Sequence, residues 1–191
     1  MATFFTSDTH FFHKNVIKYC NRPFSSIEEM NEKMIELHNN TVSPSDEVFF
    51  LGDFAFAKPD KILSVLERLN GTKHLILGNH DKDIEHDQKR FLTNKGFSTI
   101  SYAREIRREG QKICLFHYGC RVWNKSHHGS WHLFGHSHGT LEPFGKSVDV
   151  GVDSPFVTGK PEYRPLSFNE IKQFMDKRNV VKVDHHDEDT M

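Results

Sequence analysis

Five short apolar runs in this chain each end beside residues of types that bind metal ions. The runs cover residues 3–6, 48–51, 74–77, 113–116 and 131–134. Runs of this length, aromatic or β-branched and stopped by Gly or polar residues, are typical of buried strands. The residues that follow them are Asp8 and His10, Asp53, Asn79 and His80, His117, and His136 and His138. Because ligands of open α/β sheets collect beyond the carboxyl ends of the strands, we expect these side chains to converge.

Helical patterns separate the first three strands. Ser26 followed by Glu29 is typical of a capping box and predicts a helix that runs to about His38. Pro59 fits the first turn of a second helix, and an amphipathic pattern predicts a third over residues 84–94. Strands that alternate with helices in this way indicate an α/β fold.

The second half of the chain is mostly β in character. Its predicted strands are residues 100–106, 112–116, 131–134 and 148–152. A turn at Glu109 and Gly110 joins the first two, and Ser167 with Glu170 predicts a capping box that opens a last helix. A first half rich in helices and a second half rich in strands predict two sheets packed face to face, with helices outside.

Length and charge limit the possible roles of the chain. Its 191 residues and 22.3 kDa fit a single domain, to which we assign residues 1–181. The polar, acidic tail of residues 182–191 is predicted to be disordered. A net charge of -1 gives no strong attraction to a long nucleic-acid duplex or an anionic membrane. No apolar stretch approaches the roughly 20 residues that span a bilayer.

Cysteine usage points to a reducing compartment. The three residues, Cys20, Cys114 and Cys120, are odd in number and show no CxxC spacing. This argues against a disulfide framework and against a structural zinc site. We therefore expect a soluble, cytoplasmic protein.

The polar residues at the strand ends form an ordered set of short motifs. They are Asp8-Thr-His10, Gly52-Asp53, Gly78-Asn79-His80-Asp81, His117 and Gly135-His136-Ser-His138. The set resembles the calcineurin-like metallophosphoesterase superfamily, and it spans most of the chain. The resemblance implies a four-layer α/β/β/α sandwich of two mixed sheets flanked by helices, with a dinuclear metal centre at the strand ends.

The resemblance also implies a division of the ligands. Asp8, His10 and His138 would hold one ion, and Asn79, His117 and His136 the other. Asp53 would bridge both ions, and a hydroxide between them would attack phosphorus. A single histidine of this kind is more often a core or turn residue, but seven ligand types in order favour a metal site. Histidines outside the set, namely His38, His74 and His86, are predicted to lie at the surface.

The donor types themselves favour transition metals. Imidazole and carboxylate together suit manganese, iron, nickel or zinc, whereas oxygen alone would favour magnesium or calcium. We expect two divalent ions, with Mn²⁺ as the first choice. Two aspartates leave the site with a net positive charge, because the Asn79 amide adds a ligand without cancelling charge. A phosphoester anion needs that charge.

His80 has a different predicted role from the metal ligands. In the family, the histidine after the Gly-Asn pair usually contacts the phosphoryl group. We predict that His80 donates a proton to the leaving alkoxide or stabilises charge in the transition state, with Asp81 as an orienting partner or substrate contact.

Substrate contacts are predicted on two segments near the ligands. Asn15 and Arg22 follow the first metal-binding strand, where they could donate to a phosphate oxygen. A structural role for Arg22 in fixing the loop is the alternative. Arg121 and Trp123 follow His117 and could form the other wall, where Trp123 either stacks on a base or is buried under the loop.

These features predict a metal-dependent phosphoesterase that acts on small phosphodiesters such as nucleotides or cyclic phosphates. A phosphomonoesterase or an end-acting nuclease is the enzymatic alternative. Protein phosphatases of the superfamily carry Asp and Arg shortly after the Gly-Asp motif, where this chain has Phe54-Ala55-Phe56. The resemblance is greatest to small, cap-less bacterial and phage-type phosphoesterases. A non-enzymatic scaffold, like the retromer subunit of the same fold, is less favoured because here every ligand position is filled.

Overall fold

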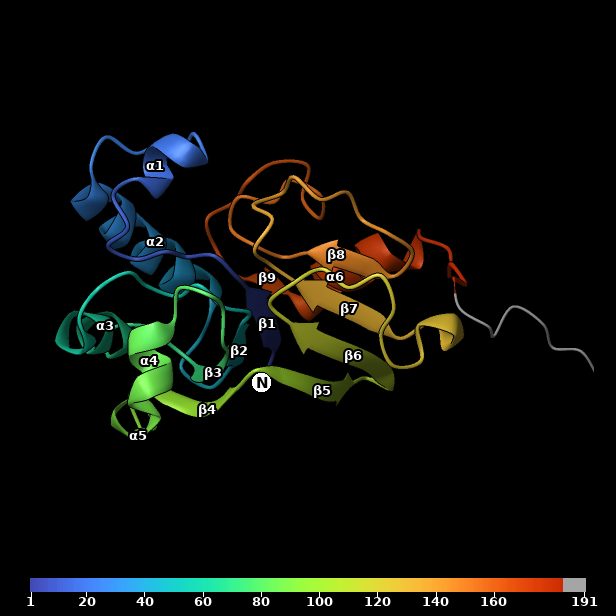
Figure 1. Cartoon of the computed structure of the whole chain (residues 1–191), viewed down its shortest axis with the longest axis horizontal. Coiled ribbons are helices and arrows are strands. Elements are labelled where there is room, and N and C mark those ends of the chain that lie inside the picture. Colours follow the sequence, from blue (N-terminus) through green and yellow to red (C-terminus); the bar gives the residue numbers. More distant parts are fainter. Residues whose placement is uncertain (184–191) are drawn as a thin grey trace, which may run out of the picture.

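Two mixed β-sheets make up the centre of the molecule, and helices flank them (Figure 1). The computed structural model describes residues 1–183. The first sheet has the order β4 (Phe97–Ser101), β3 (Thr72–Ile76), β2 (Glu47–Phe50), β1 (Thr3–Thr6) and β9 (Leu166–Ser167). The second has the order β5 (Ala103–Arg108), β6 (Gln111–Phe116), β7 (Trp131–Phe134) and β8 (Ser147–Asp149). The predicted fold class is confirmed.

Most strands within each sheet are parallel, which aligns their carboxyl ends. In the first sheet β1 to β4 are mutually parallel and only β9 is antiparallel to its neighbour. In the second sheet β6, β7 and β8 are parallel, and β5 forms an antiparallel hairpin with β6. The loops that leave β1, β2, β3, β6 and β7 therefore reach the same end of the molecule (Figure 1).

The first sheet contributes its two faces to two different cores. Phe4 and Val48 belong to an outer core, whereas Phe5 and Phe49 belong to a core between the sheets. This separation follows from strand geometry, because successive side chains point to opposite faces. The second sheet adds residues such as Leu133 to the core between the sheets.

The helices of the first half cover the outer face of the first sheet. They are α1 (Val16–Tyr19), α2 (Ile27–Thr41), α3 (Pro59–Leu66), α4 (Lys82–His86) and α5 (Gln88–Phe91). The last helix, α6 (Phe168–Asp176), packs Ile171 and Met175 into the core between the sheets. A short 3₁₀ helix, η1 (Ser126–His128), lies in the loop between β6 and β7.

The predicted helix starts agree with the capping geometry. Ser26 accepts a hydrogen bond from the Glu29 amide, as does Ser167 from the Glu170 amide. Only the second pair is a complete capping box, because the Glu29 carboxylate bonds to Ser25 instead of to Ser26. The α3 helix begins at Pro59 as predicted.

Two predicted elements are divided in the structure. The predicted strand over residues 100–106 is wrong as a single element, because the chain crosses at exposed Tyr102 from β4 in one sheet to β5 in the other. The predicted helix over residues 84–94 is broken at Asp87, whose φ of -131° and ψ of 56° are not helical. The elements α1 and β9 were not predicted at all.

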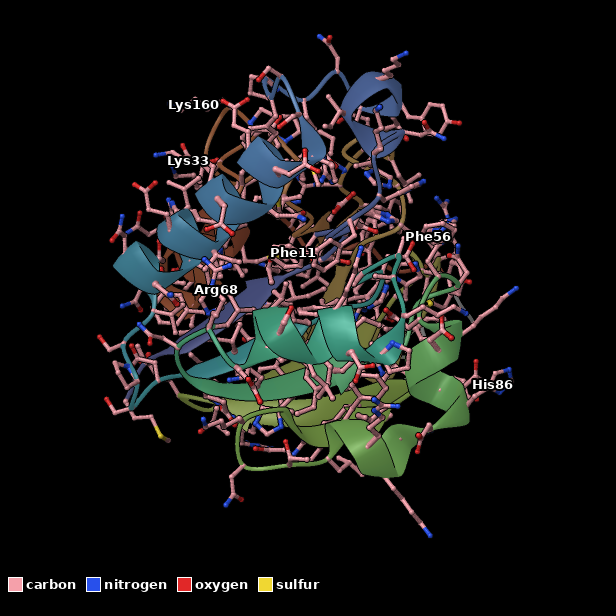
Figure 2. All side chains as sticks on the ribbon, turned by 90° about the vertical axis from the view of Figure 1, so that its left-hand side faces the viewer. Phe11, Lys33, Phe56, Arg68, His86 and Lys160 are labelled. Atoms are coloured by element: carbon pink, nitrogen blue, oxygen red, sulfur yellow. The ribbon has the colours of Figure 1, made fainter. Side chains whose placement is uncertain are left out.

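Two histidines predicted at the surface are instead buried. His38 packs its ring against Phe50, and His74 packs against Phe49, so each fills a space beside a strand of the first sheet. His86 is exposed on α4, as predicted (Figure 2). Within residues 1–183, no helix has the length and apolar character needed to cross a bilayer. From residue 184 onward, the tail predicted to be disordered lies outside the described residues.

Candidate metal centre

The loops at the strand ends bring the seven predicted ligands together. Asp8, His10 and His138 place ligand atoms within 4.8 Å of one another. A second group of Asp53, His117 and His136 meets the same limit. These two groups could each hold a metal ion, and they contain six of the seven predicted ligands.

Asp53 lies between the two groups. Its Oδ2 atom is 3.5 Å from His10 Nε2 and 3.6 Å from His117 Nε2. The seventh predicted ligand, Asn79, joins the second group, because its Oδ1 atom is 3.1 Å from His117 Nε2. One carboxylate oxygen therefore faces nitrogen donors from both groups, as a bridging ligand would.

The backbone of the ligand loops is strained. Five predicted ligands have positive φ angles although none is glycine: Asp8, His10, Asp53, His136 and His138. Non-glycine residues in this region cost of the order of 1–3 kcal/mol each and cluster at functional sites. Hydrogen bonds between loops stabilise the strained geometry, since the amides of Asp8 and His10 donate to the carbonyls of Gly52 and Asp53.

Two glycines allow these loops to approach one another. A Cβ atom at Gly135 would lie 1.9 Å from Ser7 Oγ and 2.5 Å from Asp8 Oδ2. A Cβ atom at Gly52, whose φ is +97°, would lie 2.3 Å from His117 Nδ1. The glycines in the Gly-Asp and Gly-His motifs are therefore required by the close packing of the ligands.

Hydrogen bonds fix the orientation of two ligand imidazoles. His117 Nδ1 donates to the Leu51 carbonyl at 2.7 Å, and His138 Nδ1 donates to Asp153 Oδ2 at 2.7 Å. Each bond leaves Nε2 as the atom that can bind a metal. Metal-binding histidines commonly use their other nitrogen in this way.

His10 provides the clearest indication that the site takes a cation. Both ring nitrogens are buried and have no hydrogen-bond partner within the described residues. Burial, together with the positive charges of His138 and Arg22, lowers its pKa to about 2. A neutral imidazole left unpaired in the interior costs about 1–3 kcal/mol, which coordination to a metal would recover. The residues present therefore fit a metal ion.

The charged groups of the site also indicate that it fits a metal ion. Burial and the nearby charge of Asp149 raise the pKa of Asp8 well above its ordinary value. Burial lowers the pKa of His138, but hydrogen bonds with Asp153 and Cys20 and the charge of Asp8 outweigh it and raise that pKa to about 10. Metal binding would stabilise the Asp8 carboxylate and displace the His138 proton.

Three residues beside the ligands were not identified from the sequence. Asp153 accepts from His138, and Cys20 Sγ lies 3.2 Å from His138 Nδ1. Asp149 accepts hydrogen bonds from Ser137 Oγ and from the amide of Gly139. Asp149 lies in the predicted strand 148–152, and Asp153 directly follows it. The ligands were predicted because they follow strands, and the same reasoning could have indicated Asp153. No sequence signal marks Cys20.

Arg22 is buried and holds several parts of the site together through hydrogen bonds. Its five N–H groups point at Asp153, the carbonyls of Asp8 and Thr9, and Met30 Sδ. This leaves no donor for a substrate oxygen. The structural alternative for Arg22 fits this geometry, because the guanidinium fixes both the first ligand loop and the carboxylate that orients His138.

Asp81 is also turned away from the solvent. Its Oδ2 atom accepts from the amides of Asp53 and Gly78, and its Oδ1 atom accepts from the amide of Phe54. Both oxygens are therefore used to hold the loops after β2 and β3. The geometry does not support the predicted substrate contact or a direct bond with His80.

Of the other predicted substrate residues, Asn15 and Arg121 are exposed and Trp123 is half-buried. Asn15 lies at the start of α1 and makes no capping bond with its side chain. The guanidinium of Arg121 lies 4.0 Å from the centroid of the Phe144 ring. Trp123 donates to the Ser130 carbonyl and packs on His132, which favours its burial under the loop over stacking on a base.

His80 lies between the ligands and the solvent. Its side chain is 38% exposed, and its Nε2 atom is 4.0 Å from Asp53 Oδ2. Its backbone amide donates to Asp53 Oδ1 at 2.9 Å. The ring is thus held beside the predicted bridging carboxylate while one face stays open to a ligand.

Exposed aromatic rings lie beside His80 and beside the second ligand group. Phe56 is 57% exposed (Figure 2). Its ring contacts those of His13 and His80, with centroid distances of 4.9 and 6.0 Å. Tyr19 extends the same side through His13. Tyr118 stands beside the second ligand group, with its ring centroid 4.7 Å from that of His136. Flat apolar surfaces are therefore available around the candidate centre.

Comparison with known proteins agrees with the fold and the motifs. The sequence profile of the calcineurin-like phosphoesterase family matches residues 1–119. The uncharacterized protein MJ1445 of Methanocaldococcus jannaschii is 37% identical over 185 residues, which cover 92% of each chain. The chain belongs to the calcineurin-like phosphoesterase family. It is a hydrolase that acts on phosphoester bonds, in a family that uses divalent metal ions.

Solved structures share the fold. The protein of unknown function AQ665 from Aquifex aeolicus is 24% identical, has a TM-score of 0.68, and is similar over 90% of this chain and 98% of its own. An archaeal phosphodiesterase is 20% identical with a TM-score of 0.50, over 88% of this chain and all of its own. These similarities extend through the second sheet, beyond the residues that the family profile matches.

Proposed function

We propose that this protein hydrolyses small phosphodiesters with two divalent metal ions. The observation that carries the proposal is the position of Asp53 Oδ2, 3.5 and 3.6 Å from histidine nitrogens of two separate ligand groups. In the proposed arrangement Asp8, His10 and His138 hold one ion, and Asn79, His117 and His136 hold the other. Asp53 bridges them.

The residues of the site divide the remaining work. Two divalent ions, when bound, polarise the phosphoester and lower the pKa of water to supply a hydroxide nucleophile. Asp153 and the Leu51 carbonyl hold the Nε2 atoms of His138 and His117 toward the ions. His80 donates a proton to the leaving oxygen, and its exposed side chain allows it to reach a bound ester.

Mn²⁺ is the proposed metal, with Fe, Ni or Zn as alternatives. The donor set mixes imidazole with carboxylate and one amide, which suits borderline transition metals better than magnesium or calcium. All three cysteines are free thiols, which supports the proposed cytoplasmic location.

The exposed aromatic side chains near the proposed centre favour a substrate with a flat group attached to phosphorus. Phe56 and Tyr118 stand on either side of the proposed centre, where each could stack on a nucleobase. The segment after the Gly-Asp motif is Phe54-Ala55-Phe56 and lacks the Asp and Arg of the protein phosphatases. We therefore propose a nucleotide-like diester, open or cyclic, as the substrate, in preference to a phosphoprotein.

Activity of purified, Mn²⁺-loaded protein tests this proposal. The panel contains bis-p-nitrophenyl phosphate, p-nitrophenyl phosphate, cyclic nucleotides and end-labelled oligonucleotides. We expect turnover of diesters to exceed that of monoesters, with two metals per chain by elemental analysis. Asp53→Asn should abolish both the second metal and turnover. Preference for monoesters, or release of single nucleotides from oligonucleotides, would favour the alternatives, and protein without metal or turnover would indicate a scaffold.

A further inference from the structure

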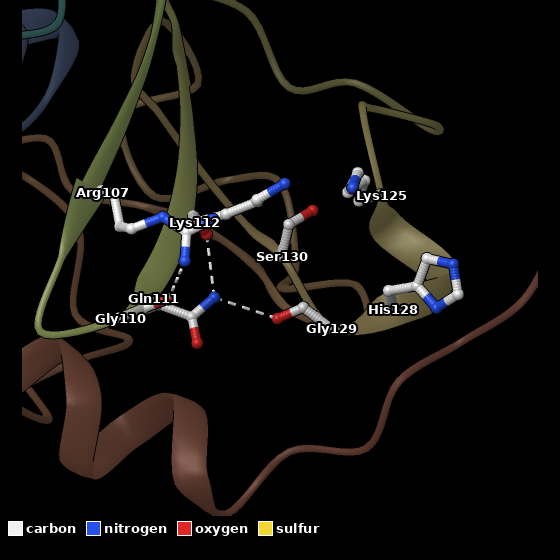
Figure 3. A pocket seen from close by; sticks show the side chains of 8 residues that line it. All are labelled: Arg107, Gly110, Gln111, Lys112, Lys125, His128, Gly129 and Ser130. Carbon is white, nitrogen blue, oxygen red and sulfur yellow. Dashed lines mark hydrogen bonds between the residues drawn. The ribbon is translucent and has the colours of Figure 1, made fainter.

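A basic cavity lies at the opposite end of the second sheet from the candidate metal centre. Its volume is about 300 Å³. It lies beside the starts of β6 and β7, whereas the metal ligands follow the ends of these strands. Its lining residues are Arg107, Gly110, Gln111, Lys112, Lys125, His128, Gly129 and Ser130 (Figure 3).

Four basic residues from different parts of the chain line this cavity. Arg107 comes from β5, Lys112 from β6, and Lys125 and His128 from the segment around η1. Lys112 extends from its strand toward the segment that carries Lys125 (Figure 3). Contact with the Lys125 amine and the charge of Arg107 lower the pKa of Lys112, so the positive charges are close enough to repel one another.

The positions of these residues go against local preferences. Arg107 and Lys112 are directly opposite each other in the antiparallel β5–β6 pair. Like charges in this register destabilise a hairpin. Lys125 has a φ of 60°, a left-handed conformation that is unusual for a residue other than glycine or asparagine. Such local conflicts are expected where a sequence serves function instead of stability.

Nothing that lines the cavity neutralises its charge. None of the lining residues is acidic, and within residues 1–183 neither Arg107, Lys112 nor Lys125 forms an ion pair. Glu105 on β5 raises the pKa of Lys112 through its charge, but it lies outside the lining, where the Asn124 side chain donates to its oxygens at 2.9 and 3.0 Å. The lining of the cavity therefore carries a net positive charge that an anion would offset.

We propose that this basic cavity binds a small anion that carries a phosphate group. Guanidinium and ammonium groups are the usual donors to phosphate oxygens, and a forked guanidinium can bind two of them. The four basic residues line one hollow instead of forming a stripe across the surface. This arrangement favours a compact anion over the backbone of a nucleic acid.

Calorimetric titration of inorganic phosphate tests the proposal. Chelator-treated protein is used, so that phosphate cannot bind metal ions at the candidate centre. We expect the double variant Lys112→Gln/Lys125→Gln to bind phosphate at least tenfold more weakly than the unaltered protein. The matched control, Lys89→Gln/Lys95→Gln, removes two exposed lysines elsewhere and should bind phosphate normally.

Thermal unfolding provides a second readout. Phosphate should raise the Tm of the unaltered protein and of the control, because a ligand that binds only the folded state stabilises it. It should leave the Tm of the Lys112→Gln/Lys125→Gln variant unchanged. Without phosphate this variant should be at least as stable as the unaltered protein, since repulsion has been removed. Turnover of the Mn²⁺-loaded variant should be normal.

Two results would overturn the proposal. One is equal phosphate affinity of the two double variants. The other is the absence of phosphate binding together with tight, Lys112- and Lys125-dependent binding of a single-stranded oligonucleotide.

Discussion

His80 and His136 are the exposed histidines of the candidate centre, and of these two only His80 lies outside both ligand groups. The ligand histidines His10 and His117 are buried, and their nitrogens face Asp53. His80 is 38% exposed and is attached to the same carboxylate through its backbone amide. A group held beside the reacting centre but open to solvent is well placed to exchange a proton with a leaving oxygen.

Replacement of His80 by Ala should separate metal binding from turnover. We expect both metals to remain bound, because His80 is not among the proposed ligands, while kcat falls roughly 100- to 10,000-fold. Elemental analysis and initial rates with bis-p-nitrophenyl phosphate measure the two effects. His86→Ala, on exposed α4, is the control and should have no effect (Figure 2). Unchanged kcat in the His80 variant would remove this role.

Phe56 should affect substrate choice more than chemistry. Phe56→Ala removes a ring that contacts His13 and His80, and stacking on a base is worth about 1–3 kcal/mol. We expect the KM of a nucleotide diester to rise between fivefold and 100-fold, while that of glycerophosphocholine stays unchanged. Phe56→Trp should keep a low KM. Equal changes for both substrates would argue against a stacking role.

Arg22 should act through stability. Arg22→Ala leaves the buried Asp153 carboxylate with only His138 of its two partners, and breaking a buried ion pair typically costs about 3–5 kcal/mol. Urea denaturation of the metal-free protein should show this loss. The exposed pair between Arg68 and Glu32 is the control, and Arg68→Ala should cost less than about 1 kcal/mol. A stable Arg22→Ala protein with a raised KM would restore the substrate contact.

Among the residues of the site, those that follow strands could be predicted from the sequence. All seven predicted ligands follow strands, and the structure brings them together. Roles that depend on contacts between distant segments could not be predicted. Arg22 and Asp153 are 131 positions apart, and nothing local to either residue indicates that they meet. The same reason explains why Asp81 was taken for a substrate contact.

Elements show a similar limit. Helix starts with capping residues and strands with apolar runs were predicted close to their positions, because these signals are local. The crossing of the chain at Tyr102 was not predicted, because β4 and β5 are nearly continuous in sequence. Only their partner strands, β3 and β6, assign them to different sheets. His38 was misplaced for a related reason: its position on α2 looks polar, but the helix packs it against β2.

The burial of His38 should make helix packing sensitive to pH. Its Nε2 atom donates to the Asn70 carbonyl at 3.0 Å, and burial lowers its pKa from 6.5 to about 4. Between these values the unfolded chain takes up a proton that the folded protein does not. The contribution of neutral, buried His38 to the free energy of unfolding is therefore complete above pH 6.5 and is lost as the pH falls toward 4.

The change in unfolding free energy with pH measures this effect. Between pH 7.5 and 5.0, His38 should account for a loss of about 2 kcal/mol, from about 1.4 kcal/mol per pH unit below 6.5. In metal-free protein, His38→Gln should reduce the pH dependence by that amount, because the Gln amide can still donate to Asn70 but does not titrate. His86→Gln should retain it. An unaltered slope in the His38 variant would show that folding does not shift the pKa of His38.

For the whole molecule, the important feature is that one sheet belongs to two cores. Each strand of the first sheet that carries a metal ligand at its end sends alternate side chains into the outer core and into the core between the sheets. Loss of either core should disturb these strands and hence the ligand loops. We therefore propose that residues 1–181 form one domain in which packing and metal binding are coupled.

This coupling predicts a single unfolding transition. Leu66→Ala leaves a cavity in the outer core and should cost about 2–5 kcal/mol. In a Trp123→Phe background, Trp131 reports on the core between the sheets by fluorescence, while circular dichroism follows the helices, of which α1 to α5 pack in the outer core. Both signals should shift to the same lower urea concentration, because two-state unfolding makes all probes coincide. If only the dichroism shifts, the two cores unfold independently, and metal-free protein should then retain a folded second sheet.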